Sequence, residues 1–247
     1  MDDDRKDEFA ISPQRFIDTL LEQKEMKLKG GLYHLTQIKL AYNSNRIEGS
    51  RLSEDQTRYI YETQTVMGDA LVNDVVEVNN HFRAFDYLIS NIGNPLTIDK
   101  IKEYHRILKS GTSDAEREWF AVGDWKRVAN SVGGLPTTPP AEVDKAMLEL
   151  LQNFKKTLTF DQIADFHYRF EAIHPFQDGN GRVGRLILFE QCLQNGIMPF
   201  IVMDDEKAFY YRGLKEYDTQ PGFLRSTFRH FQDMYYAAFK DYVPALN

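Results

Sequence analysis

Apolar residues recur at spacings of three and four along most of the 247-residue chain. This spacing places them on one face of a helix, where they can be buried against a core. The pattern is clearest over residues 75–89, 98–108 and 143–154. We therefore expect a protein built mainly from helices.

Some of these helices are preceded by residues that favour a helix start. Thr97 can serve as the N-cap of the second helix, and Thr138, which is followed by two prolines, can do the same for the third. Ser53 and Gln56 have the spacing of a capping box, which predicts a further helix start at this point.

Strand patterns are scarce in the sequence. Residues 127–132 are extended in character and are followed by Gly133-Gly134, which predicts a short hairpin or flap. Residues 200–203 form a second short candidate strand. We expect one all-α domain that carries a small β-hairpin.

Composition narrows the class of protein. No apolar run approaches the roughly 20 residues of a membrane span, and no basic cluster with interleaved aromatic residues accompanies the net charge of −7. The acidic start of the chain lacks the apolar centre of a secretory signal, and residues 1–12 read as a solvated, disordered tail. The single cysteine, Cys192, is expected to be buried. We expect a cytoplasmic protein without a nucleic-acid or membrane partner.

The stretch HPFQDGNGRVGR, residues 174–185, has the residue types of a phosphate site. Gly179, Asn180 and Gly181 allow a tight turn with exposed amides, and an apolar helix begins at the same point. Turn amides and a helix N-terminus together bind anions. Arg182 and Arg185 share one side of that helix and can bind further phosphate oxygens.

Two further side chains of this stretch add chemistry. Asp178 would repel a phosphate unless a divalent cation lies between them, and Mg²⁺ is the usual partner of phosphate and one carboxylate. His174 titrates near neutral pH and can take a proton from an attacking hydroxyl. Each feature alone is common in turns and on surfaces, but the set describes phosphoryl or nucleotidyl transfer. Phe176 is interpreted as an apolar anchor for the loop.

A dinucleotide-binding site is the main competing interpretation. Residues 179–184 match G-x-G-x-x-G, residues 166–172 alternate as a strand does, and two aspartates follow about 20 residues later. Against this, the chain lacks repeated βαβ units, and residues 161–173 fit a helix equally well. The carboxylate and the arginines around the glycines also disfavour it.

HPFQDGNGRVGR resembles the motif of the Fic family, H-P-F-x-[DE]-G-N-G-R-x-x-R, at every defined position. The resemblance implies an all-helical Fic-like core over 51–247, and transfer of AMP from ATP to a Tyr, Thr or Ser hydroxyl of a target protein. It further implies that His174 is the base, that Asp178 holds Mg²⁺, and that the loop and both arginines bind phosphates. Relatives that phosphorylate their targets tend to have Lys where this chain has Gly181, so Gly181 favours AMP transfer.

A second resemblance lies in the N-terminal helical region, residues 13–50. Ser44 to Gly49 is similar to the inhibitory motif of the family, [ST]-x-x-x-E-[GN], in the subgroup whose inhibitory helix precedes the core. The implied role is that Glu48 pairs with Arg185 and withholds it from the ATP γ-phosphate. The alternative is an ordinary helix C-terminus capped by Gly49.

Weaker correspondences concern the flap and the nucleoside. The segment Val132-Gly133-Gly134-Leu135 lies where the family has its flap, which would bind a target segment by strand addition. Tyr210, Tyr211 and Asp218 resemble residues that line the adenosine pocket of the family, although aromatic core packing would also explain the tyrosines.

Three questions stay open at this stage. The same site could remove AMP from a modified protein if Glu48 positions a water, or the chain could be a non-catalytic nucleotide-binding regulator. Self-modification and a homo-oligomer are compatible with the sequence. The target protein is not indicated.

Overall fold

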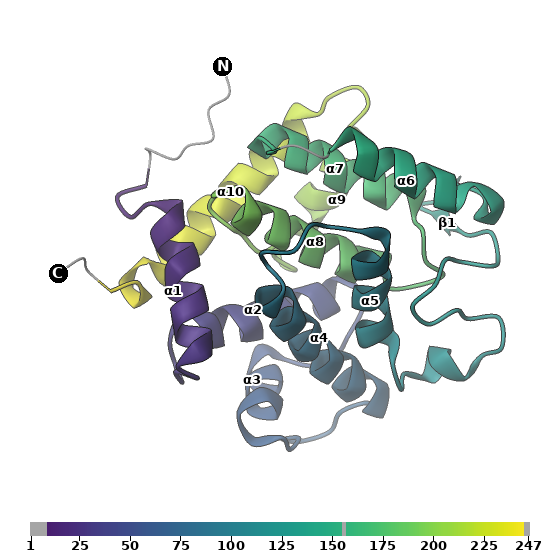
Figure 1. The fold of residues 1–247 in the computed structure, drawn as a ribbon. Helices are drawn as coiled ribbons and strands as arrows, with labels where there is room; N and C mark the ends of the chain where they lie inside the picture. Colours follow the sequence, from purple (N-terminus) through teal and green to yellow (C-terminus); the bar gives the residue numbers. More distant parts are fainter. Residues whose placement is uncertain (1–8, 155–156, 245–247) are drawn as a thin grey trace.

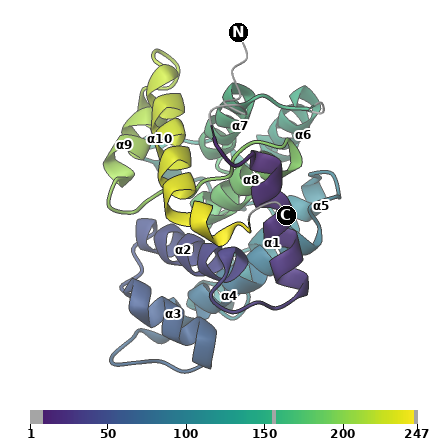
Figure 2. The ribbon, with the colours of Figure 1, turned by 90° about the vertical axis from the view of Figure 1, so that its left-hand side faces the viewer.

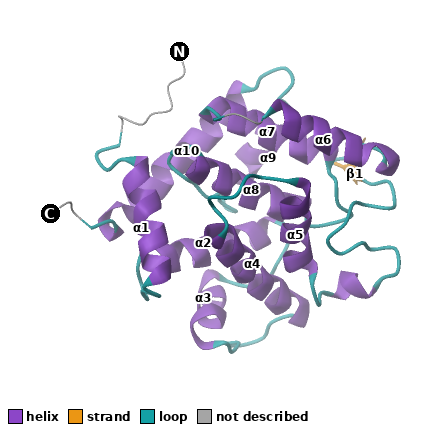
Figure 3. Ribbon diagram, viewed as in Figure 1, coloured by secondary structure: helices purple, strands orange, loops and turns teal. Residues whose placement is uncertain are grey.

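The computed structural model describes residues 9–154 and 157–244, and within them the chain folds as helices with one small hairpin (Figures 1 and 3). The predicted all-α fold with a β-hairpin is confirmed. The elements are α1 Pro13–Glu25, α2 Leu32–Ile47, α3 Glu54–Thr63, α4 Val72–Ser90, α5 Ile98–Lys109, a 3-10 turn at Ser113–Glu116, β1 Ser131–Val132, β2 Leu135–Pro136, a 3-10 turn at Pro140–Glu142, α6 Val143–Asn153, α7 Phe160–Ile173, α8 Asn180–Gln194, α9 Lys207–Lys215, α10 Gly222–Phe239 and a 3-10 turn at Lys240–Tyr242.

Helix starts follow the predicted caps with one exception. Thr97 caps α5, and Ser53 with Gln56 forms a capping box at α3. The prediction that Thr138 caps α6 is wrong, because that helix begins only after a 3-10 turn that starts at Pro140. The ring of Pro140 disfavours a helical conformation at the residue before it, and Pro139 is accordingly extended, with ψ 146°.

Helix α8 lies at the centre of the fold (Figure 1). Thirteen of its 15 residues are buried, and it contacts α2, α4, α5 and α7. A helix that is buried all round must satisfy its polar side chains within the protein, so those near its N-terminus are held by partners from other helices. Cys192 is fully buried, as expected.

Two predictions about extended segments need correction. Residues 200–203 form no strand, because no strand of the described chain lies beside them, and Phe200, Ile201 and Val202 are buried in the core instead. The hairpin is shorter than predicted and pairs Val132 with Leu135.

The predicted tail over residues 1–12 falls mostly on residues 1–8, which lie outside the described part of the chain. Phe9, which follows them, is only 8% exposed, and its ring centroid lies 4.8 Å from that of Tyr236 on α10. Ser12 already caps α1. Figure 2 shows α1 beside the end of α10, and near the other end of α1 the Gln23 side chain donates to the Tyr242 carbonyl at 3.3 Å.

The N-terminal helices are part of the main core. Phe16 and Leu20 of α1 and Leu40 of α2 belong to the same hydrophobic cluster as the apolar residues of α7, α8 and α10. A smaller cluster between α2, α3 and α4 extends it. Helix α2 therefore enters the centre of the molecule as a fixed structural element. None of the described helices has the length and apolar character needed to cross a membrane.

Candidate active site

The loop between α7 and α8 is fixed by its own backbone and by one aromatic anchor. His174 ends α7 in a left-handed conformation, φ 51°, and Gly179 starts α8 with φ 82°. Phe176 between them is fully buried and stacks on His105, with ring centroids 4.0 Å apart. The Asn180 amide accepts from the Phe176 N–H at 2.8 Å and donates to its carbonyl at 2.9 Å. The predicted role of Phe176 as an apolar anchor is thus confirmed. The Asn180 side chain makes its hydrogen bonds within the loop.

His174 is neutral at neutral pH in this environment. Burial lowers the pKa of its imidazole, and the nearby Lys126 ammonium lowers it further, to about 4. Its Nδ1 is buried and has no hydrogen-bond partner among the described residues. A neutral imidazole can accept a proton at the ring nitrogen that its tautomer leaves unprotonated.

Asp178 is ionised and held by two cations. Its Oδ2 lies 2.7 Å from Lys109 Nζ and 3.0 Å from the Arg182 guanidinium. Burial alone would raise the pKa of this carboxyl, but Arg182 and Lys109 outweigh it and lower the pKa to about 2. Both ion pairs use the same oxygen, and 45% of the side chain is exposed. The carboxylate therefore has an accessible face for a further cation.

The sequence did not reveal Lys109, which lies at the end of α5. Its side chain is fully buried, and its ammonium lies 3.0 Å from both Glu77 and Asp114 in addition to Asp178. Oxygens of these three carboxylates lie within 4.8 Å of one another, a spacing that could also hold a metal ion. In this structure the positive charge of Lys109 partly neutralises the three carboxylates. The sequence could not reveal this cluster, because its four residues come from separate segments that no local pattern connects.

The two arginines of α8 have different partners. Arg182 is buried and pairs with Glu77 at 2.7 Å and with Asp178. Arg185, also buried, donates to the Ser44 hydroxyl and carbonyl at 2.9 Å each and to Glu48 Oε1 at 2.6 Å. The predicted contact between Glu48 and Arg185 is present in the structure.

Glu48 reaches Arg185 from the C-terminus of α2, where Gly49 follows with φ 97°. The ordinary interpretation of this segment as a capped helix end is therefore correct too. Gly181 lies directly beneath the pair, because a Cβ at this position would lie 2.2 Å from Glu48 Oε1 and 2.9 Å from Arg185 NH1. Only glycine leaves room for this ion pair without displacement of a neighbour.

A buried polar layer lies behind Arg185. Burial raises the pKa of Glu171 to about 7, although the charge of Arg185 opposes this. His167 Nε2 lies 2.8 Å from the Tyr210 hydroxyl, and Tyr210 is 1% exposed. The helical spacing of His167 and Glu171 on α7, continued by His174 at its C-cap, was the signal in the sequence that could have identified this layer.

The proposed adenosine residues are only partly brought together. Tyr210 and Tyr211 lie beside the contact between Glu48 and Arg185, and the Tyr211 hydroxyl donates to the Ile47 carbonyl at 3.3 Å. Asp218 instead lines a separate depression beside Tyr168 and Tyr217. The nucleoside role of Asp218 therefore stays a prediction without support from position.

The flap is exposed and turns at its two glycines. Gly133 and Gly134 have φ 58° and 81°, as the tight turn of a hairpin requires. Val132 and Leu135 are 47% and 69% exposed, which is unusual for apolar residues in the strands of a hairpin. Their side chains are therefore accessible to another segment.

Known proteins resemble this chain in sequence and in fold. The model of the Fic/DOC family matches residues 95–192. The protein adenylyltransferase Fic of Drosophila erecta is 30% identical over 185 residues, which are 70% of this chain and 36% of the relative. The protein adenylyltransferase fic-1 of Caenorhabditis elegans is 30% identical over 188 residues, or 72% of this chain and 36% of the relative. This chain thus spans much less than half of either relative.

Solved structures share the fold. A Fic domain containing signaling protein from Bacteroides thetaiotaomicron has a TM-score of 0.69 at 24% identity, covering 92% of this chain and 94% of that one. A variant fragment of Fic-1 from C. elegans has a TM-score of 0.68 at 26% identity, covering 94% and 71%. The chain belongs to the Fic/DOC family, with the family domain at residues 95–192.

Proposed function

We propose that this protein is an autoinhibited adenylyltransferase that moves AMP from ATP to a Tyr, Thr or Ser hydroxyl of a target protein. The observation that carries the proposal is the gathering of neutral His174, ionised Asp178 and buried Arg185 around the N-terminus of α8. Relatives over most of this chain bear the name protein adenylyltransferase. A base, an anionic ligand and a cation at one helix N-terminus suit nucleotidyl transfer.

The chemical step uses residues of the loop. The imidazole of His174 takes the proton of the target hydroxyl, and the hydroxyl oxygen attacks the α-phosphorus of ATP. The bond between this phosphorus and the bridging oxygen breaks, and pyrophosphate leaves. The backbone amides at Gly179 to Gly181 and the α8 N-terminus stabilise the negative charge on the phosphates.

A magnesium ion fits Asp178. Its carboxylate is ionised, is 45% exposed and uses one oxygen for both of its ion pairs, so the accessible face can bind a cation that also contacts phosphate. When bound, the ion would neutralise charge on the departing pyrophosphate. Lys109 and Arg182 keep the carboxylate oriented for it.

Inhibition follows from competition for one guanidinium. Glu48 Oε1 lies 2.6 Å from Arg185, and this arginine is the cation that would bind the ATP γ-phosphate. While Glu48 holds it, ATP lacks one of its anchors and the α-phosphate is poorly aligned for attack. Ser44 holds the same arginine in place in either state.

The target is proposed to dock on the flap. The exposed strands β1 and β2 belong to the segment that contacts the loop holding His174, since the Val128 N–H, just before β1, donates to the Gln177 side chain at 3.2 Å. An extended target segment could add to the hairpin as a third strand. Its hydroxyl would then approach the imidazole.

The test is incorporation of label from α-labelled ATP into protein by the Glu48→Gly chain, which is released from the proposed inhibition, followed by mass spectrometry. We expect a mass increase that corresponds to AMP, and none with His174→Ala. If the chain without substitutions instead removes AMP from a protein that already carries it, the reverse reaction is the physiological one. If neither AMP transfer nor AMP removal occurs, and pyrophosphate is never released, the chain is a nucleotide-binding regulator.

A further inference from the structure

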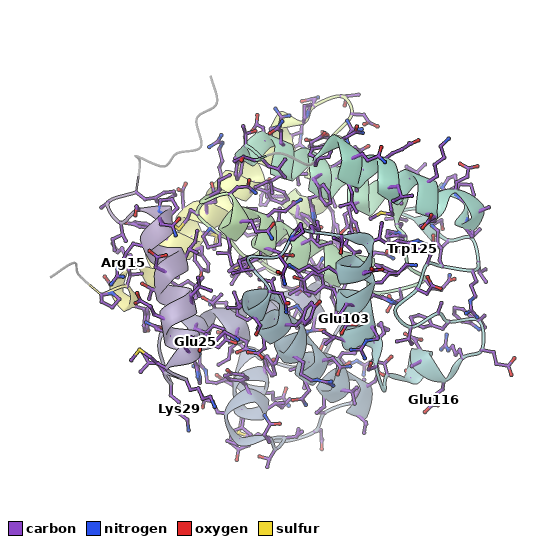
Figure 4. The ribbon with its side chains drawn as sticks, viewed as in Figure 1. Arg15, Glu25, Lys29, Glu103, Glu116 and Trp125 are labelled. Atoms are coloured by element: carbon purple, nitrogen blue, oxygen red, sulfur yellow. The ribbon has the colours of Figure 1, made fainter. Side chains whose placement is uncertain are left out.

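Lys126 is a buried cation on the segment that leads into the flap, next to Trp125, which is labelled in Figure 4. The residue is 3% exposed, and no carboxylate in the described ranges lies within ion-pair distance of its ammonium. Burial lowers the pKa of this lysine to about 8. Burial of an ammonium group costs desolvation free energy, which hydrogen bonds to protein atoms must offset.

The ammonium joins the flap to the loop of the base. It donates to Asn130 Oδ1 at 2.7 Å and to Thr137 Oγ1 at 2.6 Å, and these two residues flank the hairpin on either side. Its third acceptor, at 3.4 Å, is the carbonyl of Ile173, directly before His174. Three donors thus meet three acceptors, which is the full capacity of an ammonium.

Main-chain contacts strengthen the same connection. The Lys126 N–H donates to the Pro175 carbonyl at 2.9 Å, and the Asn130 amide donates to the Phe176 carbonyl at 3.0 Å. The carbonyls on both sides of His174 are therefore bound by the flap segment. These hydrogen bonds hold the flap and the loop of His174 at a fixed distance from each other.

We propose that Lys126 is a positioning residue that sets the distance between the flap and His174, so that a hydroxyl carried by a flap-bound segment reaches the imidazole. This inference rests on the proposed adenylyl transfer. Lysine suits the position because a single nitrogen supplies all three donors, whereas an apolar side chain would remove one donor from each of the three oxygens, and Asn130 Oδ1 would keep only its hydrogen bond from the Thr137 hydroxyl. The same positive charge helps to keep the pKa of His174 low.

The experiment compares Lys126→Met and Lys126→Arg within a Glu48→Gly chain, with Lys145→Met as the matched control because its side chain is 81% exposed on α6. We expect Lys126→Met to lower label incorporation from ATP by at least about tenfold, with little change in the KM for ATP. Lys126→Arg keeps charge and donors and should recover part of the rate. The control should match its parent.

Two measurements do not depend on transfer. In Lys126→Met, amide exchange over residues 128–137 should accelerate by roughly tenfold, and NMR titration should show the pKa of His174 raised from its value of about 4. A folded Lys126→Met chain with unchanged exchange and unchanged titration overturns the positioning role. If exchange and titration both change while no variant transfers AMP, the positioning role stands and the proposed function fails.

A milder variant covers the case in which Lys126→Met does not fold. Thr137→Val removes one acceptor of Lys126, together with the hydrogen bonds that the hydroxyl donates to Asn130, and keeps the shape of the side chain, so the same changes should appear at smaller amplitude. Absence of any change in flap exchange and His174 titration in Thr137→Val would overturn the proposal as well.

Discussion

Replacing Glu48 by glycine should activate AMP transfer. The carboxylate lies 2.6 Å from an Arg185 side chain that is 2% exposed, while 29% of the Glu48 side chain is exposed. A charge-assisted hydrogen bond in such a partly dry site contributes about 1.5–3 kcal/mol. A γ-phosphate that competes for this guanidinium must overcome that free energy. Removal of the Glu48 carboxylate should therefore raise the rate of AMP transfer roughly tenfold to a hundredfold at fixed ATP concentration.

The assay is incorporation of α-labelled ATP into the chain itself or into lysate proteins. Glu48→Gln is the matched variant, because it keeps the size of the side chain and loses its charge, and it should give an intermediate rate. Arg185 should stay in place in both variants, since Ser44 binds it twice. If Glu48→Gly binds ATP by calorimetry yet incorporates no more AMP than the unmodified chain, the inhibitory role of Glu48 is wrong.

Three further predictions concern the same loop and the core around it. His174→Ala should abolish transfer while calorimetry still detects ATP binding, and retained transfer would exclude this residue as the base. Gly181→Ala should lower the melting temperature, because its methyl group would lie 2.2 Å from Glu48 Oε1. Combination with Glu48→Gly should remove most of this loss. If the changes in melting temperature of the two substitutions simply add, the predicted clash is wrong. The free energy of unfolding should be constant with respect to histidine above about pH 6.5 and fall as the pH drops toward 4, by up to about 1.4 kcal/mol per pH unit for each histidine, because the unfolded chain takes up protons that the folded chain excludes. The histidines with a lowered pKa are His81, His105 and His167, at about 3, and His174, at about 4. Urea unfolding at several pH values measures this free energy, and a value that does not change with pH would refute the prediction.

The sequence predicted those features that depend on neighbouring residues. The caps at Thr97 and Ser53 and the turn at Gly133 involve groups within a few positions of each other, so local spacing was sufficient. The contact between Glu48 and Arg185 spans the chain, and it was predicted only because both residues lie in motifs that the family resemblance connects.

Features that depend on tertiary packing were missed. Lys109 and Lys126 look like surface lysines in the sequence, and their burial follows from carboxylates or carbonyls supplied by distant segments. Residues 200–203 have the character of a strand but no neighbouring strand to pair with. Phe9 lies in a polar stretch, and its burial follows from packing against the main core, including the ring of Tyr236.

The placement of α2 constrains how the proposed inhibition by Glu48 could be released. Twelve of the 16 residues of this helix are buried, and it contacts α1, α3, α4 and α8. Withdrawal of the whole helix would open the interior of the protein, whereas Glu48 follows the last helical residue and is joined to a flexible glycine. An activator therefore needs to rotate one carboxylate away from its arginine, and a ligand or target of modest affinity has enough binding free energy to do so.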